Sequence, residues 1–356
     1  MNAITPIDFH CHGIGRFDFA DPNSLVLDEL ENHLKIEGTA AILTLYLPKA
    51  HLTNFIEFMY EFDAGKKSGR YKHIIGIALE GPLLASFGGT PEQGCWKPTL
   101  SEWEQLARLG SHGLVYVVLS PNAEFNQKDD YPKDIIEIAK ILLNHRVKPA
   151  LGHFGKEDAE ATAISISHIC DYAEQAGMTP LFTDHLYNDM PVKCQYHWRN
   201  GIEKSKRKSI TPEILKQEWT DENIEDILGP VPATLIGYAK KGILKLCLNC
   251  DGDHVDIDLC KRTIEFVGAE NLMLMTDRIQ SEILAGQKLT RNTANTLLYQ
   301  KAGIVAGGTQ SVMRQLGNLM LIGVPSRDIF QMAFATAAGA LFGQDTLSLD
   351  RVESGL

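Results

Sequence analysis

The chain has 356 residues, of which 44% are hydrophobic and 22% are charged, and its formal net charge is −11. This length fits one large α/β barrel or two average domains, and the acidic balance disfavours a nucleic-acid or anionic-membrane partner, because either would need a basic surface. No segment approaches the run of about 18 apolar residues that a membrane helix needs, and no leader segment is visible, so we expect a cytoplasmic protein.

Eight short apolar runs, each ending in a polar residue or a turn signal, predict buried β-strands. They span residues 4–10, 40–46, 74–80, 114–120, 148–153, 180–185, 244–251 and 271–277. Amphipathic segments with helical spacing lie between them, for example 134–144 and 157–175, and closing helices are expected at 310–321 and 326–341. Parallel neighbours need crossover connections, and strands buried on both faces are apolar throughout. The pattern therefore predicts an α/β fold, a closed (β/α)8 TIM barrel.

The first strand runs into Asp8-Phe9-His10-Cys11-His12-Gly13. Alternate side chains of a strand share a face, so His10 and His12 could bind one metal ion together, although such a pair alone is a weak signal. The other strands supply partners, because five of them end in a further group of this kind: Glu80, His153, His185, Asp251 and Asp277. All carboxyl ends of barrel strands meet at one rim, where active sites lie. Histidines and carboxylates gathered there are costly without a metal ion, so the pattern predicts a metal centre.

The longest connection, residues 190–242, is expected to form a lid or substrate wall at this rim. It carries Trp198, Arg199 and a basic run at 204–208, which we interpret as a solvated loop. It also contains predicted helices, which span 212–217, 221–228 and 231–240. No internal repeat or interdomain linker is visible, so we expect a single barrel domain over residues 1–356 with this rim insertion.

The seven cysteines are an odd number and are scattered along the chain, which indicates a reduced compartment. Cys247 and Cys250 form a Cys-X-X-Cys pair inside an apolar run, and the sequence has no second such pair. We therefore interpret both as core residues and not as zinc ligands.

Six motifs occur in an order and at a spacing that resemble those of the N-acetylglucosamine-6-phosphate deacetylases, a family of the metal-dependent amidohydrolase superfamily. They are Asp8-Phe9-His10-Cys11-His12-Gly13, Leu79-Glu80-Gly81-Pro82, Gly152-His153, Asp184-His185-Leu186-Tyr187-Asn188-Asp189-Met190, Asp251-Gly252-Asp253-His254-Val255 and Thr276-Asp277. The resemblance covers roughly residues 4–342. The second, fourth and fifth motifs are together specific to the family, whereas the His-X-His and the final Asp are shared across the superfamily.

The resemblance implies two divalent ions per chain. His10 and His12 would hold one ion, His153 and His185 the other, and Glu80 would be shared by or adjacent to both. Zinc is the first expectation, with iron, manganese, nickel and cobalt as alternatives, because histidine and carboxylate sets accept several divalent ions. The resemblance also implies a homodimer.

The resemblance further implies a hydrolytic mechanism. Asp277 would be a metal ligand, bind the metal-activated water, act as the general base and return the proton to the departing amine. His254 would orient or polarise the substrate carbonyl. Asn188 would contact the substrate. A bound metal lowers the pKa of water and polarises the amide carbonyl, and a carboxylate beside the nucleophile moves the proton.

Four features depart from the family pattern. The β-sandwich that flanks the barrel in relatives is expected to be absent or vestigial. The loop 87–92 lacks a histidine that contacts the acyl carbonyl in many relatives. The residues after Met190 do not reproduce the phosphate-binding pattern of the sugar-phosphate enzymes, although Arg199 or the basic run at 204–208 could take its place. Arg278 stands where a small residue is usual; it could clamp a substrate carboxylate or phosphate, or form a salt bridge with an acid such as Asp253.

The leading prediction is an amidohydrolase that cleaves the N-acyl amide, N-acetyl first, of an amino sugar or amino-sugar phosphate. One alternative is an amidohydrolase that acts on another small amide, such as an N-acyl amino acid, a cyclic amide or a dipeptide-like bond. The other alternative, from a different class, is a non-catalytic barrel that binds a ligand or a partner protein.

Overall fold

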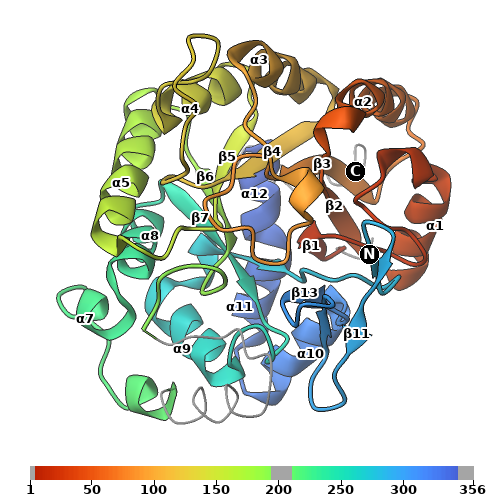
Figure 1. The fold of residues 1–356 in the computed structure, drawn as a ribbon. Coiled ribbons are helices and arrows are strands. Elements are labelled where there is room, and N and C mark those ends of the chain that lie inside the picture. The colour runs from red at the N-terminus through yellow and green to blue at the C-terminus, as the bar shows by residue number, and fades with distance from the viewer. Residues whose placement is uncertain (1–4, 194–210, 344–356) are drawn as a thin grey trace.

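The computed structural model describes residues 5–193 and 211–343. Its centre is one sheet of eight strands in the order β1 to β8, in which each strand pairs in parallel with the next. The strands are β1 Ile7–Cys11, β2 Ala40–Leu45, β3 Ile74–Glu80, β4 Leu114–Leu119, β5 Lys148–Leu151, β6 Leu181–His185, β7 Leu244–Asn249 and β8 Leu272–Met275. Figure 1 shows these strands at the centre with helices around them. The predicted (β/α)8 barrel is confirmed.

The helices lie between the strands as the sequence periodicity predicts. They are α1 Leu27–Glu37, α2 Leu52–Lys67, α3 Leu100–Arg108, α4 Ile135–Asn144, α5 Ala159–Gln175, α7 Ile224–Leu228, α8 Pro230–Lys240, α9 Ile257–Val267, α10 Val312–Leu321, α11 Ser326–Phe330 and α12 Thr336–Phe342. Local signals fix several ends: Asp134 and Asp158 accept backbone N–H groups as N-caps of α4 and α5, and Gly38 ends α1 at a φ of 72°. None of the helices within the described ranges is long and apolar enough to span a membrane.

Side chains alternate between two buried layers along the strands. Leu43, Leu79 and Leu119 belong to the outer layer under the helices, whereas Phe9 and Tyr116 belong to the barrel interior. The interior also receives side chains from the C-terminal helical segment, where a π-helical turn, Gln331–Ala335, joins α11 to α12. The predicted closing helix at 326–341 is therefore present but interrupted.

The barrel closes through backbone contacts between the ends of β1 and β8. The amides of Thr276 and Asp277 both donate to the carbonyl of His10, at 3.2 and 3.0 Å, and the amide of His12 donates to the carbonyl of Arg278 at 2.9 Å. This closure places the His-X-His segment of β1 directly beside Asp277.

Two small antiparallel sheets lie between β8 and α10. One pairs β9 Ile283–Leu284 with β10 Gln287–Lys288, and the other contains β11 Thr290–Arg291, β12 Leu297–Tyr299 and β13 Val305–Gly308. Sequence reasoning missed these strands, because two to four residues are too few to show a period.

The predicted insertion at 190–242 is described in part. The structure has a helical turn at 211–215, followed by α7 and α8, close to the predicted helices. Trp198, Arg199 and the basic run at 204–208 lie outside the described residues.

Candidate active site

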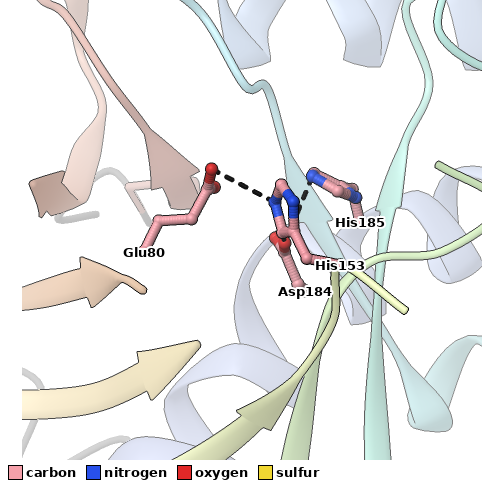
Figure 2. Close-up of side chains that lie close together, drawn as sticks. All are labelled: Glu80, His153, Asp184 and His185. Carbon is pink, nitrogen blue, oxygen red and sulfur yellow. Dashed lines mark ion pairs between the residues drawn. The ribbon is translucent and has the colours of Figure 1, made fainter. Parts of the chain in front are cut away.

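The carboxyl ends of five barrel strands bring seven acidic and imidazole side chains to one point on the rim. These side chains are His10 from β1 and His12 directly after it, Glu80 from β3, His153 after β5, Asp184 and His185 from β6, and Asp277 after β8. All seven are buried. Figure 2 shows four of them, Glu80, His153, Asp184 and His185, pointing toward one another.

The first set of ligand atoms comes from β1 and β3. The Nε2 atoms of His10 and His12 lie 2.8 Å apart, and each lies 3.1 Å from Oε2 of Glu80. Nδ1 of His12 donates to the carbonyl of Thr44 at 2.9 Å, which leaves its Nε2 as the lone-pair atom. When both rings are neutral, two imidazole nitrogens and a carboxylate oxygen therefore converge without a proton between them, which is the arrangement that a bound cation stabilises.

Tyr116 fixes the orientation of His10. Its hydroxyl donates to the carbonyl of Phe9 at 2.9 Å, so it accepts the hydrogen bond from Nδ1 of His10, which lies 3.0 Å away. The Nε2 atom of His10 is then also a lone-pair atom facing the centre. Metal-binding histidines are commonly held in this way through the other ring nitrogen.

The second set comes from β3, β5 and β6. Nε2 of His153 lies 3.1 Å from Oε1 of Glu80 and 3.2 Å from Oδ2 of Asp184, and Nε2 of His185 lies 3.1 Å from the same Asp184 oxygen. Nδ1 of His153 donates to the carbonyl of Ser86 at 2.9 Å. Its Nε2 is thereby left as the lone-pair atom that faces two carboxylates.

Glu80 lies between the two sets and presents one carboxylate oxygen to each. Oε2 faces His10 and His12, and Oε1 faces His153. The Thr90 hydroxyl donates to Oε1 at 2.6 Å, which holds the carboxylate in this orientation.

Sequence reasoning did not assign Asp184 a role in the site. Neighbouring residues on a regular strand face opposite sides, so an acid directly before His185 should point away from it. The register between β6 and β7 is irregular between Phe182 and His185, and such irregularities re-aim side chains. The signal available in the sequence was the position of Asp184 inside the Asp-His-Leu-Tyr-Asn motif.

The residues present fit divalent metal ions. Two groups have ligand atoms that all lie within 4.8 Å of one another: Glu80, His153, Asp184 and His185, and His10, His12 and Glu80. Within the described ranges, buried side-chain atoms that lack a hydrogen-bond partner gather here, among them Nε2 of His153, both oxygens of Asp184 and Nδ1 of His185. Such atoms are costly when buried, and metal coordination would satisfy them.

The pKa shifts show that the site favours positive charge. Burial alone would raise the pKa of Glu80, but His153 and His12 outweigh burial and hold this pKa well below its usual range. Burial alone would lower the pKa of His12, yet the charge of Glu80 and a hydrogen bond with Asp277 raise it to about 10. The same balance, with Glu80 as the main charged partner, raises the pKa of His153 well above its usual value.

Asp277 lies at the edge of the first set. Its Oδ1 is 3.2 Å from Nε2 of His12 and 4.0 Å from Nε2 of His10, and its Oδ2 is 3.3 Å from Nε2 of His254. Burial opposes ionisation of Asp277, but hydrogen bonds with His12 and His254 outweigh it and hold its pKa well below the usual range.

His254 connects Asp277 to Asp251. Its Nδ1 lies 2.6 Å from Oδ2 of Asp251, whose other oxygen accepts the His254 amide at 2.7 Å. Burial lowers the pKa of His254, but the Asp251 charge and hydrogen bond raise it to about 10. Asp251, which the sequence grouped with the predicted metal-site residues, therefore pairs with His254 instead, and His254 in turn faces Asp277.

The predicted substrate-binding residues have different outcomes. Asn188 lines the small cavity beside His185 and Asp277, and within the described residues neither polar atom of its side chain has a hydrogen-bond partner. Arg199 lies outside the described residues. Arg278 is fully buried, and its guanidinium is paired with Glu37 and Asp8. The prediction that Arg278 binds the substrate is therefore wrong. The alternative of a salt bridge is right, but the partners are Glu37 and Asp8 and not Asp253.

No family model matches the chain. The N-acetylglucosamine-6-phosphate deacetylase of Bacillus subtilis (strain 168) is 26% identical over 258 residues, which cover 69% of this chain and 56% of that protein. The chain thus spans little more than half the length of the curated relative that it matches.

Solved structures are similar over nearly the whole chain. N-acetylglucosamine-6-phosphate deacetylase from Pasteurella multocida matches with a TM-score of 0.66 and 15% identity, covering 96% of this chain and 77% of that chain. The enzyme of the same name from Mycobacterium smegmatis matches with a TM-score of 0.65 and 20% identity, covering 95% of this chain and 78% of that chain. The enzyme of the same name from Thermotoga maritima matches with a TM-score of 0.61 and 18% identity, covering 95% of this chain and 78% of that chain. This chain therefore has the fold of the N-acetylglucosamine-6-phosphate deacetylases, as its motifs predict.

Proposed function

We propose that this protein is a metal-dependent amidohydrolase that removes the N-acyl group, N-acetyl first, from an amino sugar or an amino-sugar phosphate. The main observation behind the proposal is that Glu80 presents one carboxylate oxygen to His10 and His12 and the other to His153. Asp277 lies beside the first of these histidine pairs. The similarity to the Bacillus subtilis deacetylase supports the substrate class, as does a Mycobacterium smegmatis mutant enzyme solved in complex with N-acetyl-D-glucosamine-6-phosphate.

Two divalent ions per chain belong to this proposal, zinc first, with iron, manganese, nickel or cobalt as alternatives. His10 and His12 would hold one ion, His153 and His185 the other, and Glu80 would contribute one oxygen to each. When bound, such ions supply Lewis acidity that activates water and polarises an amide carbonyl.

The chain's own residues supply the proton transfer. Oδ1 of Asp277 faces the first histidine pair, so it accepts the proton of the attacking water and returns it to the departing amine. His254 lies on the other side of the carboxylate, where Asp251 holds its ring and its Nε2 faces Oδ2 of Asp277. This ring is placed to donate to the carbonyl oxygen of the substrate amide.

The loop between β3 and α3 packs closely against the site. A Cβ atom on Gly88 would lie 2.9 Å from Oδ2 of Asp189 and 3.1 Å from the His153 ring, and one on Gly89 would lie 2.4 Å from the carbonyl of Val305. Glycine at both positions therefore lets the β3–α3 loop lie against the ligands and against β13. The side chain of Asn188 faces the remaining cavity, where its amide can donate to and accept from substrate hydroxyls.

The test is a substrate panel with acetate release as the readout. The metal-reconstituted protein is incubated with N-acetylglucosamine, N-acetylglucosamine 6-phosphate and N-acetylated amino acids. We expect release from the amino sugars, and the phosphorylated arm decides whether a phosphate is recognised. Hydrolysis of the acetylated amino acids alone would overturn the proposed substrate class.

Two further properties are part of the proposal. A homodimer is checked by light scattering of the metal-loaded protein, for which twice the chain mass is expected. A cytoplasmic location is checked by fractionation of cells that express the full chain.

A further inference from the structure

Asp184 is fully buried and lies close to His153 and His185 (Figure 2) and to His10 of the first pair. Its Oδ2 is 3.2 Å from Nε2 of His153 and 3.1 Å from Nε2 of His185, and its Oδ1 is 3.4 Å from Nδ1 of His10. Neither oxygen accepts a well-aligned hydrogen bond from the residues that the structure describes. A buried carboxylate in this state requires a compensating positive charge nearby.

The tautomer of His153 indicates where this compensating positive charge would lie. Because Nδ1 donates to the carbonyl of Ser86, Nε2 of the neutral ring carries a lone pair. That lone pair faces Oε1 of Glu80 and Oδ2 of Asp184. Three acceptor atoms thus converge on one point, and Oδ2 of Asp184 also faces Nε2 of His185.

We propose that Asp184 is a ligand of the ion held by His153 and His185, so that this position has four protein ligands and the position at His10 and His12 has three. This assignment rests on the two-ion centre of the proposed function. The four ligand atoms at the second position, from Glu80, His153, Asp184 and His185, all lie within 4.8 Å of one another.

Because one metal position has four protein ligands and the other has three, we expect the two positions to have different roles. Four protein ligands close a tetrahedral site, whereas catalytic sites keep a position open for water or substrate. Asp277 forms its ion pairs with His12, His10 and His254, so the proton-transferring carboxylate lies beside the three-ligand position. The His10–His12 position, which lies beside Asp277, would therefore have a coordination site left for a water or substrate atom, whereas the four-ligand position would have none from the protein side.

The first test counts metal ions in Asp184→Asn and Asp184→Ser after reconstitution with zinc and removal of free metal. We expect near two ions per chain in the wild type and near one in either variant. The matched control is Asp158→Asn on the same rim, because Asp158 is exposed, its side chain accepts the Ala161 amide as the N-cap of α5, and asparagine caps equally well. This control should keep both ions.

The second test separates a ligand from a structural ion pair. In chelator, Asp184→Asn should melt at a higher temperature than the wild type, because an uncompensated buried charge has been removed, and zinc should stabilise the variant less than the wild type. If Asp184 only pairs with a protonated His153, the variant keeps two ions and melts lower with and without zinc, which overturns the assignment. A wild type that binds fewer than two ions also overturns it.

These outcomes are independent of the proposed activity. A protein that binds two ions, loses one in Asp184→Asn and releases no acetate from any amino sugar would refute the substrate proposal and leave the ligand assignment standing. An Asp184→Asn variant that keeps both ions refutes the ligand assignment, whether or not the wild type is a deacetylase.

Discussion

Arg278 and Glu37 form a two-pronged ion pair behind the site, with Nη1 2.6 Å from Oε1 and Nη2 2.8 Å from Oε2. Glu37 is the last residue of α1, and Arg278 follows Asp277 directly. The Arg278 carbonyl accepts the amide of His12 at 2.9 Å. The pair therefore anchors the segment that places Asp277 beside the first histidine pair.

Breaking this pair should destabilise the protein. Glu37→Gln leaves the buried guanidinium with Asp8 as its remaining acidic partner, so we expect the free energy of unfolding to fall by about 3 kcal/mol in urea denaturation. Glu29→Gln, which removes an exposed partner of Arg16, is the matched control and should change it by about 0.5 kcal/mol or less. Equal effects of the two variants would contradict the anchoring role.

The same pair predicts a pH dependence. Burial raises the pKa of Glu37, but the hydrogen bond and charge of Arg278 outweigh it and hold this pKa below the usual 4.5. The stabilisation is therefore present above the unfolded-state pKa and is lost as the pH falls through the folded-state pKa. The difference in free energy of unfolding between the wild type and Glu37→Gln should shrink below about pH 4.5. A difference that stays constant in acid would argue against the pair as its source.

Thr90 should tune metal affinity through Glu80. Thr90→Val removes the hydroxyl that donates to Oε1 of Glu80 at 2.6 Å and keeps the shape of the side chain. Loss of such a partner weakens metal binding by about 10- to 100-fold, which competition with a chelator of known affinity measures. Thr90→Ser keeps the donor and should bind metal nearly as the wild type does. Unchanged affinity in Thr90→Val would show that Thr90 does not orient the carboxylate.

The opening histidine pair should account for one ion. Replacing His10 and His12 together by glutamine should lower bound metal from near two ions per chain to near one, as counted by elemental analysis. His168→Gln, at an exposed position of α5, is the control and should keep both ions. A wild type that never holds more than one ion would show that His10 and His12 are not a primary metal site.

Sequence alone predicted the barrel because its strands are short, largely apolar runs that end in polar residues, and parallel topology then brings the strand ends together. His10, Glu80, His153 and Asp277 could be placed at one rim on that ground. The reasoning failed where local geometry departs from the ideal strand, as at Asp184, whose alternation is broken by the irregular register of β6.

Sequence reasoning also could not predict contacts between residues that lie far apart in the sequence. Arg278 pairs with Glu37, 241 positions away, and no local pattern points to that acid. Thr90 reaches Glu80 through a loop whose path the sequence does not determine. The short strands β9 to β13 were missed because each has only two to four residues, too few to show a period.

The most direct test of the proposed activity compares acetate release from N-acetylglucosamine and its 6-phosphate by the wild type and by Asp277→Asn, with bound metal counted in both. We expect the wild type to release acetate and Asp277→Asn to hold the same metal while turnover falls by about 10²- to 10⁴-fold, the range for loss of a general base. A wild type that carries its ions and releases no acetate from either amino sugar, or an Asp277→Asn variant with unchanged turnover, would contradict the account.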